Sequence, residues 1–224
     1  QSERYSGPQF ARGRPIGNAQ RATFGGFGRF GFRINGRNRR DGQLVNLTDI
    51  GANVTELREG DTGVIAAQLG REPRGLVAIG ARCACGRPAV TVTSPRLPEG
   101  TPFPTLFYLS LPYLVYEISR LEADGKMAEY NEALAESPEL AAAHARAHHS
   151  YLERRRILGD VPEIAGVSAG GMPSRVKCLH ALAGYSLAAG RGVCPIGDMA
   201  LDVVGWDASV CHCEQTEDLK ENLA

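Results

Sequence analysis

Short apolar runs bounded by turn-forming residues predict three strands in the middle of the chain. The runs at residues 76–82 and 89–93 are separated by a tight turn over 83–88, which predicts a β-hairpin. A third apolar run at 106–109 follows a loop that four prolines stiffen, at positions 95, 98, 102 and 104. The three runs together predict a small antiparallel sheet.

Start and stop signals predict helices on both sides of these strands. Asp61 as N-cap and Gly70 as stop predict a short helix before the hairpin. After the sheet, the Ser137-Pro138 pair opens a long alanine-rich helix that ends near Gly159, with Arg154–Arg156 in its last turns. Further helices are expected over residues 112–123, 126–136 and 173–189. The predicted fold class is therefore α+β, a small antiparallel sheet (hairpin plus one strand) packed by four to five helices.

Composition divides the chain into an arm, a domain and a tail. The 224 residues are 43% hydrophobic with a formal net charge of zero, which suits one compact domain, placed at 50–206. Residues 1–45 are rich in glycine and arginine and are expected to be a disordered basic arm, while 207–224 form an acidic tail.

Cysteine usage and hydropathy predict a cytoplasmic protein. No apolar run approaches the roughly 20 residues needed to cross a bilayer, and no signal-peptide pattern opens the chain, so no membrane partner is expected. The six cysteines then belong in a reducing compartment, where metal binding or burial is favoured over disulfides.

Three sequence blocks resemble a known bacterial family. They read AAQLGREPRG at 66–75, PRLPEGTPFPTL at 95–106 and SAGGMPSRVKCLH at 168–180. In this order they resemble the "domain of unknown function" family 501, and the likeness covers about residues 56–205, leaving the arm outside. The resemblance implies a bacterial cytoplasmic protein, often encoded near a septum-formation initiator and an exopolyphosphatase. It implies no activity, cofactor or catalytic residue.

The third block also predicts an anion site. Ser168, Gly170 and Gly171 precede the expected helix start at Pro173, where free backbone N–H groups and the dipole favour a phosphate or carboxylate. Arg175 and Lys177 would add charge, with Arg96 as a possible second cation. The alternative is a flexible connector with two surface cations, and the spacing of a P-loop is absent.

His180 is the candidate for proton transfer, and a partly buried structural histidine is the alternative. Its neighbour Cys178 lies two residues away. Within a regular helix such residues point about 200° apart, so the two are not expected to share one metal ion. Cys178 is instead expected to be buried as a small hydrophobe.

Two C-x-C clips form a candidate zinc site. Cys83 and Cys85 lie in the hairpin turn, and Cys211 and Cys213 lie near the end of the chain. Four thiolates would make a closed, tetrahedral, structural site. The C-x-C spacing and the polar surroundings of the second clip argue against it, and free thiols are the alternative.

Two weaker signals complete the set. His144 and His148 share a helix face and could hold a metal, but no third ligand suggests itself and a solvated face is the preferred interpretation. Aromatic residues alternate with arginine over 24–33 of the arm, a pattern that suits single-stranded nucleic acid.

Two functional hypotheses follow from the sequence. The first is a protein, possibly an enzyme, that binds a phosphate-bearing small molecule at the Ser168–Lys177 loop. The second is a non-enzymatic interaction module with protein or RNA partners, stabilised by zinc. Enzyme status and oligomeric state stay open.

Overall fold

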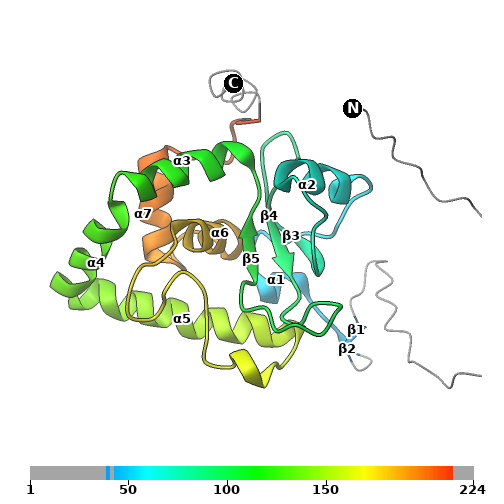
Figure 1. The fold of residues 1–224 in the computed structure, drawn as a ribbon, viewed down its shortest axis with the longest axis horizontal. Helices are drawn as coiled ribbons and strands as arrows, with labels where there is room; N and C mark the ends of the chain where they lie inside the picture. Colours follow the sequence, from blue (N-terminus) through cyan, green and yellow to red (C-terminus); the bar gives the residue numbers. More distant parts are fainter. Residues whose placement is uncertain (1–38, 41–42, 214–224) are drawn as a thin grey trace, which may run out of the picture. The chain divides into compact units, whose positions relative to one another are not determined.

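A three-stranded antiparallel sheet lies at one side of the fold (Figure 1). The computed structural model describes residues 39–40 and 43–213. Its strands β3 (Leu76–Arg82), β4 (Pro88–Thr93) and β5 (Phe107–Leu109) pair in that order, which confirms the predicted hairpin plus one strand. Most of the predicted arm lies outside the described residues, but β1 (Arg39–Arg40) and β2 (Gln43–Leu44) pair antiparallel within its last part.

The described part of the chain holds seven α-helices, two more than the sequence predicted. The unpredicted ones are α1 (Leu47–Ile50) and α7 (Pro195–Val204). The others are α2 (Asp61–Leu69), α3 (Pro112–Ala123), α4 (Lys126–Glu136), α5 (Pro138–Leu158) and α6 (Leu179–Ala189), with a short 3₁₀ turn, η1 (Pro162–Ile164). The α+β class is confirmed.

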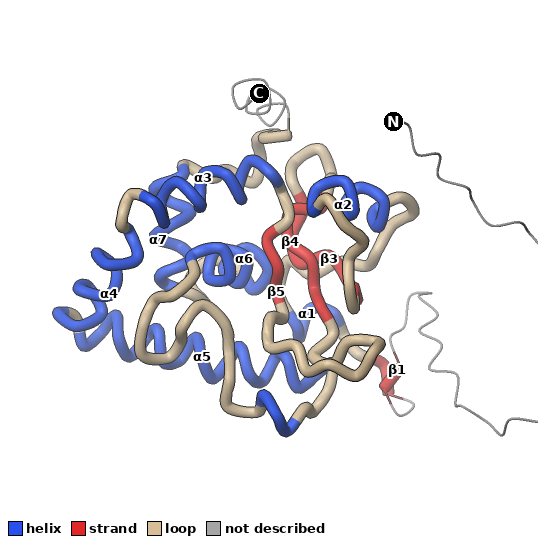
Figure 2. Tube along the Cα trace, in the orientation of Figure 1, coloured by secondary structure: helices blue, strands red, loops and turns tan. Residues whose placement is uncertain are grey.

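Helix α6 lies at the centre of the fold, where it packs against β5 and β3 of the sheet and against helices α3 and α7 (Figures 1 and 2). All of its residues from Leu182 to Ala189 are buried. Its close packing against α7 requires a glycine, because a Cβ atom on Gly197 would lie 2.1 Å from the carbonyl oxygen of Leu182. None of the helices among the described residues is long and apolar enough to span a membrane.

Two predicted helix starts can be compared directly with the structure. Ser137 caps α5 as expected, since its hydroxyl accepts a hydrogen bond from the Leu140 N–H at 3.2 Å. Asp61 is not an N-cap, because Gly60 occupies that position. The Asp61 carboxylate instead forms a salt bridge of 2.7 Å with Arg82, which joins the start of α2 to β3.

The prediction for the start of α6 was wrong by six residues. The helix begins at Leu179 rather than Pro173, and Cys178 is its N-cap with an extended backbone (φ −155°, ψ 112°). Proline at 173 suits the first turn of a helix, but residues 168–177 fold instead as a loop with Gly170 and Gly171 at positive φ. This difference changes which side chains meet near His180.

Candidate metal centre

The turn between β3 and β4 places two cysteine side chains on one side of the hairpin. The Cys83 N–H donates to the Arg87 carbonyl at 2.9 Å, and the Gly86 N–H donates to the Cys83 carbonyl at 2.8 Å. Gly86 has φ of 89°, a left-handed conformation that glycine adopts without strain. The tight turn makes both thiols, at Cys83 and Cys85, available to a common partner.

The segment after α7 returns to this turn. It is held by His212, a buried residue whose ring stacks on Tyr113 and on Trp206, each with ring centroids 4.7 Å apart. The His212 backbone N–H also donates to the Cys83 sulfur at 3.4 Å. Residues 207–213 were predicted as the start of an acidic tail, and no sequence pattern predicted this aromatic stack.

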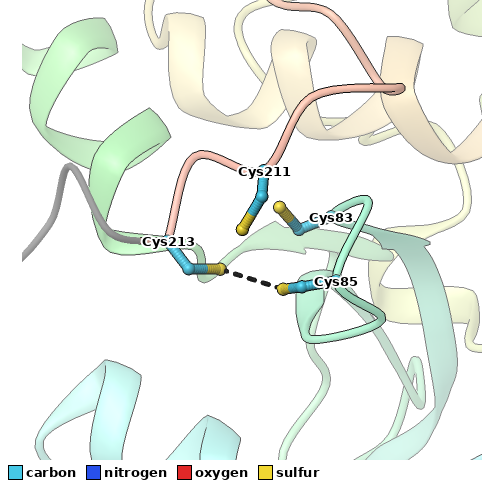
Figure 3. Close-up of side chains that lie close together, drawn as sticks. All are labelled: Cys83, Cys85, Cys211 and Cys213. Carbon is cyan, nitrogen blue, oxygen red and sulfur yellow. Dashed lines mark hydrogen bonds between the residues drawn. The ribbon is translucent and has the colours of Figure 1, made fainter.

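Four sulfur atoms meet where the two segments touch. The Sγ atoms of Cys83, Cys85, Cys211 and Cys213 all lie within 4.8 Å of one another and point toward a common centre (Figure 3). The Cys85 and Cys213 sulfurs are 3.4 Å apart, far longer than a disulfide bond of about 2.05 Å. Sulfurs on the corners of a zinc tetrahedron with bonds of about 2.3 Å are about 3.8 Å apart, which these positions accommodate.

The four thiols also perturb one another electrostatically. Burial, reinforced by the neighbouring thiol of Cys85, raises the pKa of Cys213 strongly. Burial acts in the same direction on Cys85, but hydrogen bonds from the Arg87 backbone and the other thiols outweigh it, so the pKa of Cys85 is lowered. Negative charge on one sulfur therefore disfavours it on the next, a conflict that a bound cation would remove.

The predicted anion loop is closed by its own hydrogen bonds. The Lys177 N–H donates to the Gly170 carbonyl at 2.7 Å, and the Arg175 N–H donates to the Gly171 carbonyl at 3.3 Å. The Ser168 hydroxyl is buried against His148 at 2.9 Å, while the Arg175 and Lys177 side chains are exposed. The expected helix N-terminus is absent from this loop, and anion binding there stays a prediction.

Arg96 does not join that loop. Its guanidinium forms a salt bridge of 2.7 Å with Glu163 and donates to the Gly100 carbonyl at 2.7 Å.

His144 and His148 of α5 are buried rather than solvated, so that interpretation was wrong for these two residues, while the neighbouring His149 is exposed. His144 is fully buried, and its Nε2 lies 3.3 Å from the Arg175 carbonyl. His148 is buried against Ser168. Burial lowers the pKa of both imidazoles. The two side chains contact residues of the 168–177 loop. Among the described residues, neither histidine belongs to a group that could hold a metal.

His180 lies in a different cluster from the one predicted. Its Nδ1 is 3.2 Å from the Glu122 carboxylate, and its Nε2 is 3.1 Å from both the Val115 carbonyl and the Ser119 hydroxyl. Its pKa is raised to about 9, first by a hydrogen bond with Cys178 and then by Glu122. Cys178 is half-buried and forms a hydrogen bond with His180, although the sequence predicted that the two side chains point about 200° apart. That argument assumed a helix through residue 178.

Comparisons with known proteins add a family but no activity. A family model described as "Protein of unknown function (DUF501)" matches residues 79–202, more than half of the 224 residues. The matched range includes Cys83, Cys85 and the whole His180 cluster, and it ends before Cys211. Neither the comparison with curated proteins nor that with solved structures found a match.

Proposed function

We propose that this chain, which belongs to the family of proteins of unknown function DUF501, is a zinc-binding protein with a structural four-cysteine site. The ion would fasten the C-terminal segment to the β3–β4 turn. One observation carries the proposal: two C-x-C clips about 128 residues apart in sequence bring all four sulfurs within 4.8 Å of one another.

The donor set favours zinc over other ions. Four thiolates in a tetrahedral arrangement suit zinc or an iron–sulfur centre, whereas magnesium and calcium prefer oxygen ligands. The Cys83 sulfur already accepts a hydrogen bond from the His212 N–H, an interaction that stabilises a metal-bound thiolate. Four protein ligands also leave no coordination position for a substrate, which supports a structural role for this ion.

A structural ion here supports the hypothesis of an interaction module more than that of a phosphate-binding protein. The zinc would stabilise the surface formed by the hairpin turn, the start of α3 and residues 206–213. The phosphate hypothesis has no comparable convergence of groups, because the backbone of the 168–177 loop bonds to itself.

Metal content of the purified full-length chain tests the proposal. The double variant Cys85→Ser, Cys213→Ser removes one ligand from each clip and should lose one zinc per chain, with a lower Tm. Cys194→Ala is the matched control, because Cys194 is buried and belongs to none of the groups of described residues that could hold a metal. It should keep the zinc content of the wild type.

Two results would overturn the four-cysteine site. One is a double variant with the same zinc content as the wild type. The other is a mass measurement under non-reducing conditions showing that these cysteines are paired as disulfides in the freshly purified protein.

A further inference from the structure

The geometry points to a second zinc site, formed by Glu122, Cys178 and His180, with one coordination position open to a cavity. A Cys178 sulfur, a His180 ring nitrogen and a Glu122 carboxylate oxygen all lie within 4.8 Å of one another. The three residues are half-buried and come from α3 and the first residues of α6. This site is independent of the four-cysteine site, with which it shares no residue.

Local structure explains why three donors converge here. Cys178 is the N-cap of α6 and has an extended backbone, so its side chain does not follow the helical rotation that would separate it from His180. Glu122 approaches from α3 and accepts a hydrogen bond from the Leu179 N–H at 2.6 Å. This bond fixes the carboxylate beside the helix start.

The second nitrogen of His180 is held as in a metal-binding histidine. A backbone carbonyl only accepts hydrogen bonds, so the contact of 3.1 Å between Nε2 and the Val115 oxygen requires a proton on Nε2. When a metal ion displaces the second ring proton, the coordinating electron pair is on Nδ1, the atom that faces Glu122 at 3.2 Å. Metal-ligating histidines characteristically donate their other N–H to a carbonyl or carboxylate in this way.

The cavity beside the cluster has room for water and a small molecule. Its volume is about 740 Å³, and Cys178, His180 and Ser119 lie on its wall. The aromatic residues Tyr108 and Tyr116 also line it. The described residues that line it include no lysine or arginine, so no fixed side-chain cation competes with a metal ion.

The ligands and the opening together define the kind of ion and its fourth partner. Thiolate, imidazole and carboxylate are the three ligand types of protein zinc, and a thiolate disfavours magnesium and calcium. Three protein ligands with an open position are the arrangement of zinc sites that bind a water or a substrate. The fourth ligand is therefore a water that a small molecule with an oxygen donor, such as a carboxylate, displaces.

Zinc stoichiometry of the full-length chain tests this site separately from the first. We expect two zinc ions per chain in the wild type and in Cys194→Ala. We expect one zinc ion per chain in the double variant Cys178→Ser, His180→Gln. We also expect one in the double variant Cys85→Ser, Cys213→Ser. Glu122→Gln keeps an acceptor for the Leu179 N–H but loses the charge, and should weaken the second zinc by at least about tenfold.

The pattern of losses distinguishes the two proposals. A wild type with one zinc that survives in Cys178→Ser, His180→Gln overturns the second site and leaves the four-cysteine site standing. If the wild type binds one zinc and the Cys178→Ser, His180→Gln variant binds none, the four-cysteine site is overturned and the second site stands. Circular dichroism and Tm of each variant show whether a loss of metal reflects unfolding, and a Glu122→Gln protein that is folded with unchanged zinc affinity also overturns the second site.

Cobalt substitution tests the open position. Azide, a small anion, should change the visible spectrum of the cobalt-loaded wild type and of Cys85→Ser, Cys213→Ser. It should leave the spectrum of Cys178→Ser, His180→Gln unchanged, because a four-thiolate site has no free position. A wild type that binds two cobalt ions and does not respond to azide contradicts the open position.

Discussion

At the scale of single residues, Arg155 shows how a buried charge can organise loops. Only 4% of its surface is exposed, and its guanidinium donates to the carbonyl oxygens of Pro104, Ile164 and Val167. The five N–H groups of arginine suit such a task, because they bind several acceptors in fixed directions. The run Arg154–Arg156 was predicted in the last turns of this helix, where Arg155 and Arg156 lie, and Arg155 also joins the proline-rich loop to the segment after α5.

Replacing Arg155 should destabilise the fold strongly. Arg155→Met keeps much of the apolar stem but removes a buried, charged donor that binds three carbonyl oxygens, and we expect a loss of about 2–4 kcal/mol in the free energy of unfolding. Urea denaturation measures it. Arg156→Met is the matched control, because its side chain is 58% exposed and its change should stay within about 0.5 kcal/mol. Equal losses in both variants would contradict this role for Arg155.

Some residues of the candidate metal sites could be predicted from the sequence and others were missed, for a physical reason. All four cysteines of the proposed zinc site could be named, because cysteine chemistry is visible without a structure. Glu122 could not be named, because it lies 56 residues before Cys178 and only the packing of α3 against α6 brings the two together. The stacking of His212 was missed because its aromatic partner Tyr113 is also remote in sequence.

At the scale of elements, the 168–177 loop depends on its glycines. Gly170 has φ of 67°, and a Cβ atom there would lie 2.6 Å from the Leu182 side chain. Gly170→Ala combines a left-handed conformation with a clash in the core, and should cost about 2–4 kcal/mol of stability. Gly166→Ala, where a Cβ meets nothing within 4 Å, should change stability by less than about 1 kcal/mol. Thermal denaturation measures both, and a Gly166→Ala variant that is less stable than Gly170→Ala would refute this account of the loop.

The buried histidines His144 and His148, which contact this loop, should make the stability of the fold depend on pH. Their pKa values in the fold are lowered by burial below the ordinary 6.5, so the unfolded chain takes up protons first as the pH falls. Their effect is absent above about pH 7, and stability is lost as the pH falls below about 6.5, by up to about 1.4 kcal/mol per pH unit for each group.

The double variant His144→Gln, His148→Gln isolates this effect. Urea denaturation between pH 5 and pH 8 should show a wild type that weakens on acidification more steeply than the variant. Comparing the two proteins removes contributions common to both, including loss of metal. Parallel pH curves would show that these histidines carry no such linkage.

Elements were predicted well where local signals decide, and poorly where packing decides. The starts of α3, α4 and α5 are marked by proline, glycine or a serine cap, and their bounds were predicted to within one residue. The start of α6 was wrong because Gly170 and Gly171 close a loop that a proline alone does not reveal. Helix α7 was missed, and its position depends on Gly197 packing against α6.

At the scale of the whole molecule, the proposed zinc would join two segments that are remote in sequence. It would bind the hairpin near the start of the domain to the segment that follows the last helix. The His212 stack contributes to the same contact, so the segment is held by a metal and by aromatic packing.

Removing the metal should release this segment first. After treatment with a strong chelator, amide hydrogen exchange should increase at residues 206–213 and in the 83–87 turn, while β4 and α6 stay protected. Adding zinc back should restore protection. Uniform exchange throughout the domain would mean that the metal supports the whole core, and no change at 206–213 would mean that it does not hold the segment.

The most direct test of the four-cysteine site is zinc X-ray absorption on the full-length Cys178→Ser, His180→Gln variant, in which only that site remains. The account predicts one zinc with four sulfur neighbours at about 2.3 Å. A coordination shell dominated by nitrogen or oxygen, or a protein without zinc that is nonetheless folded, would contradict it.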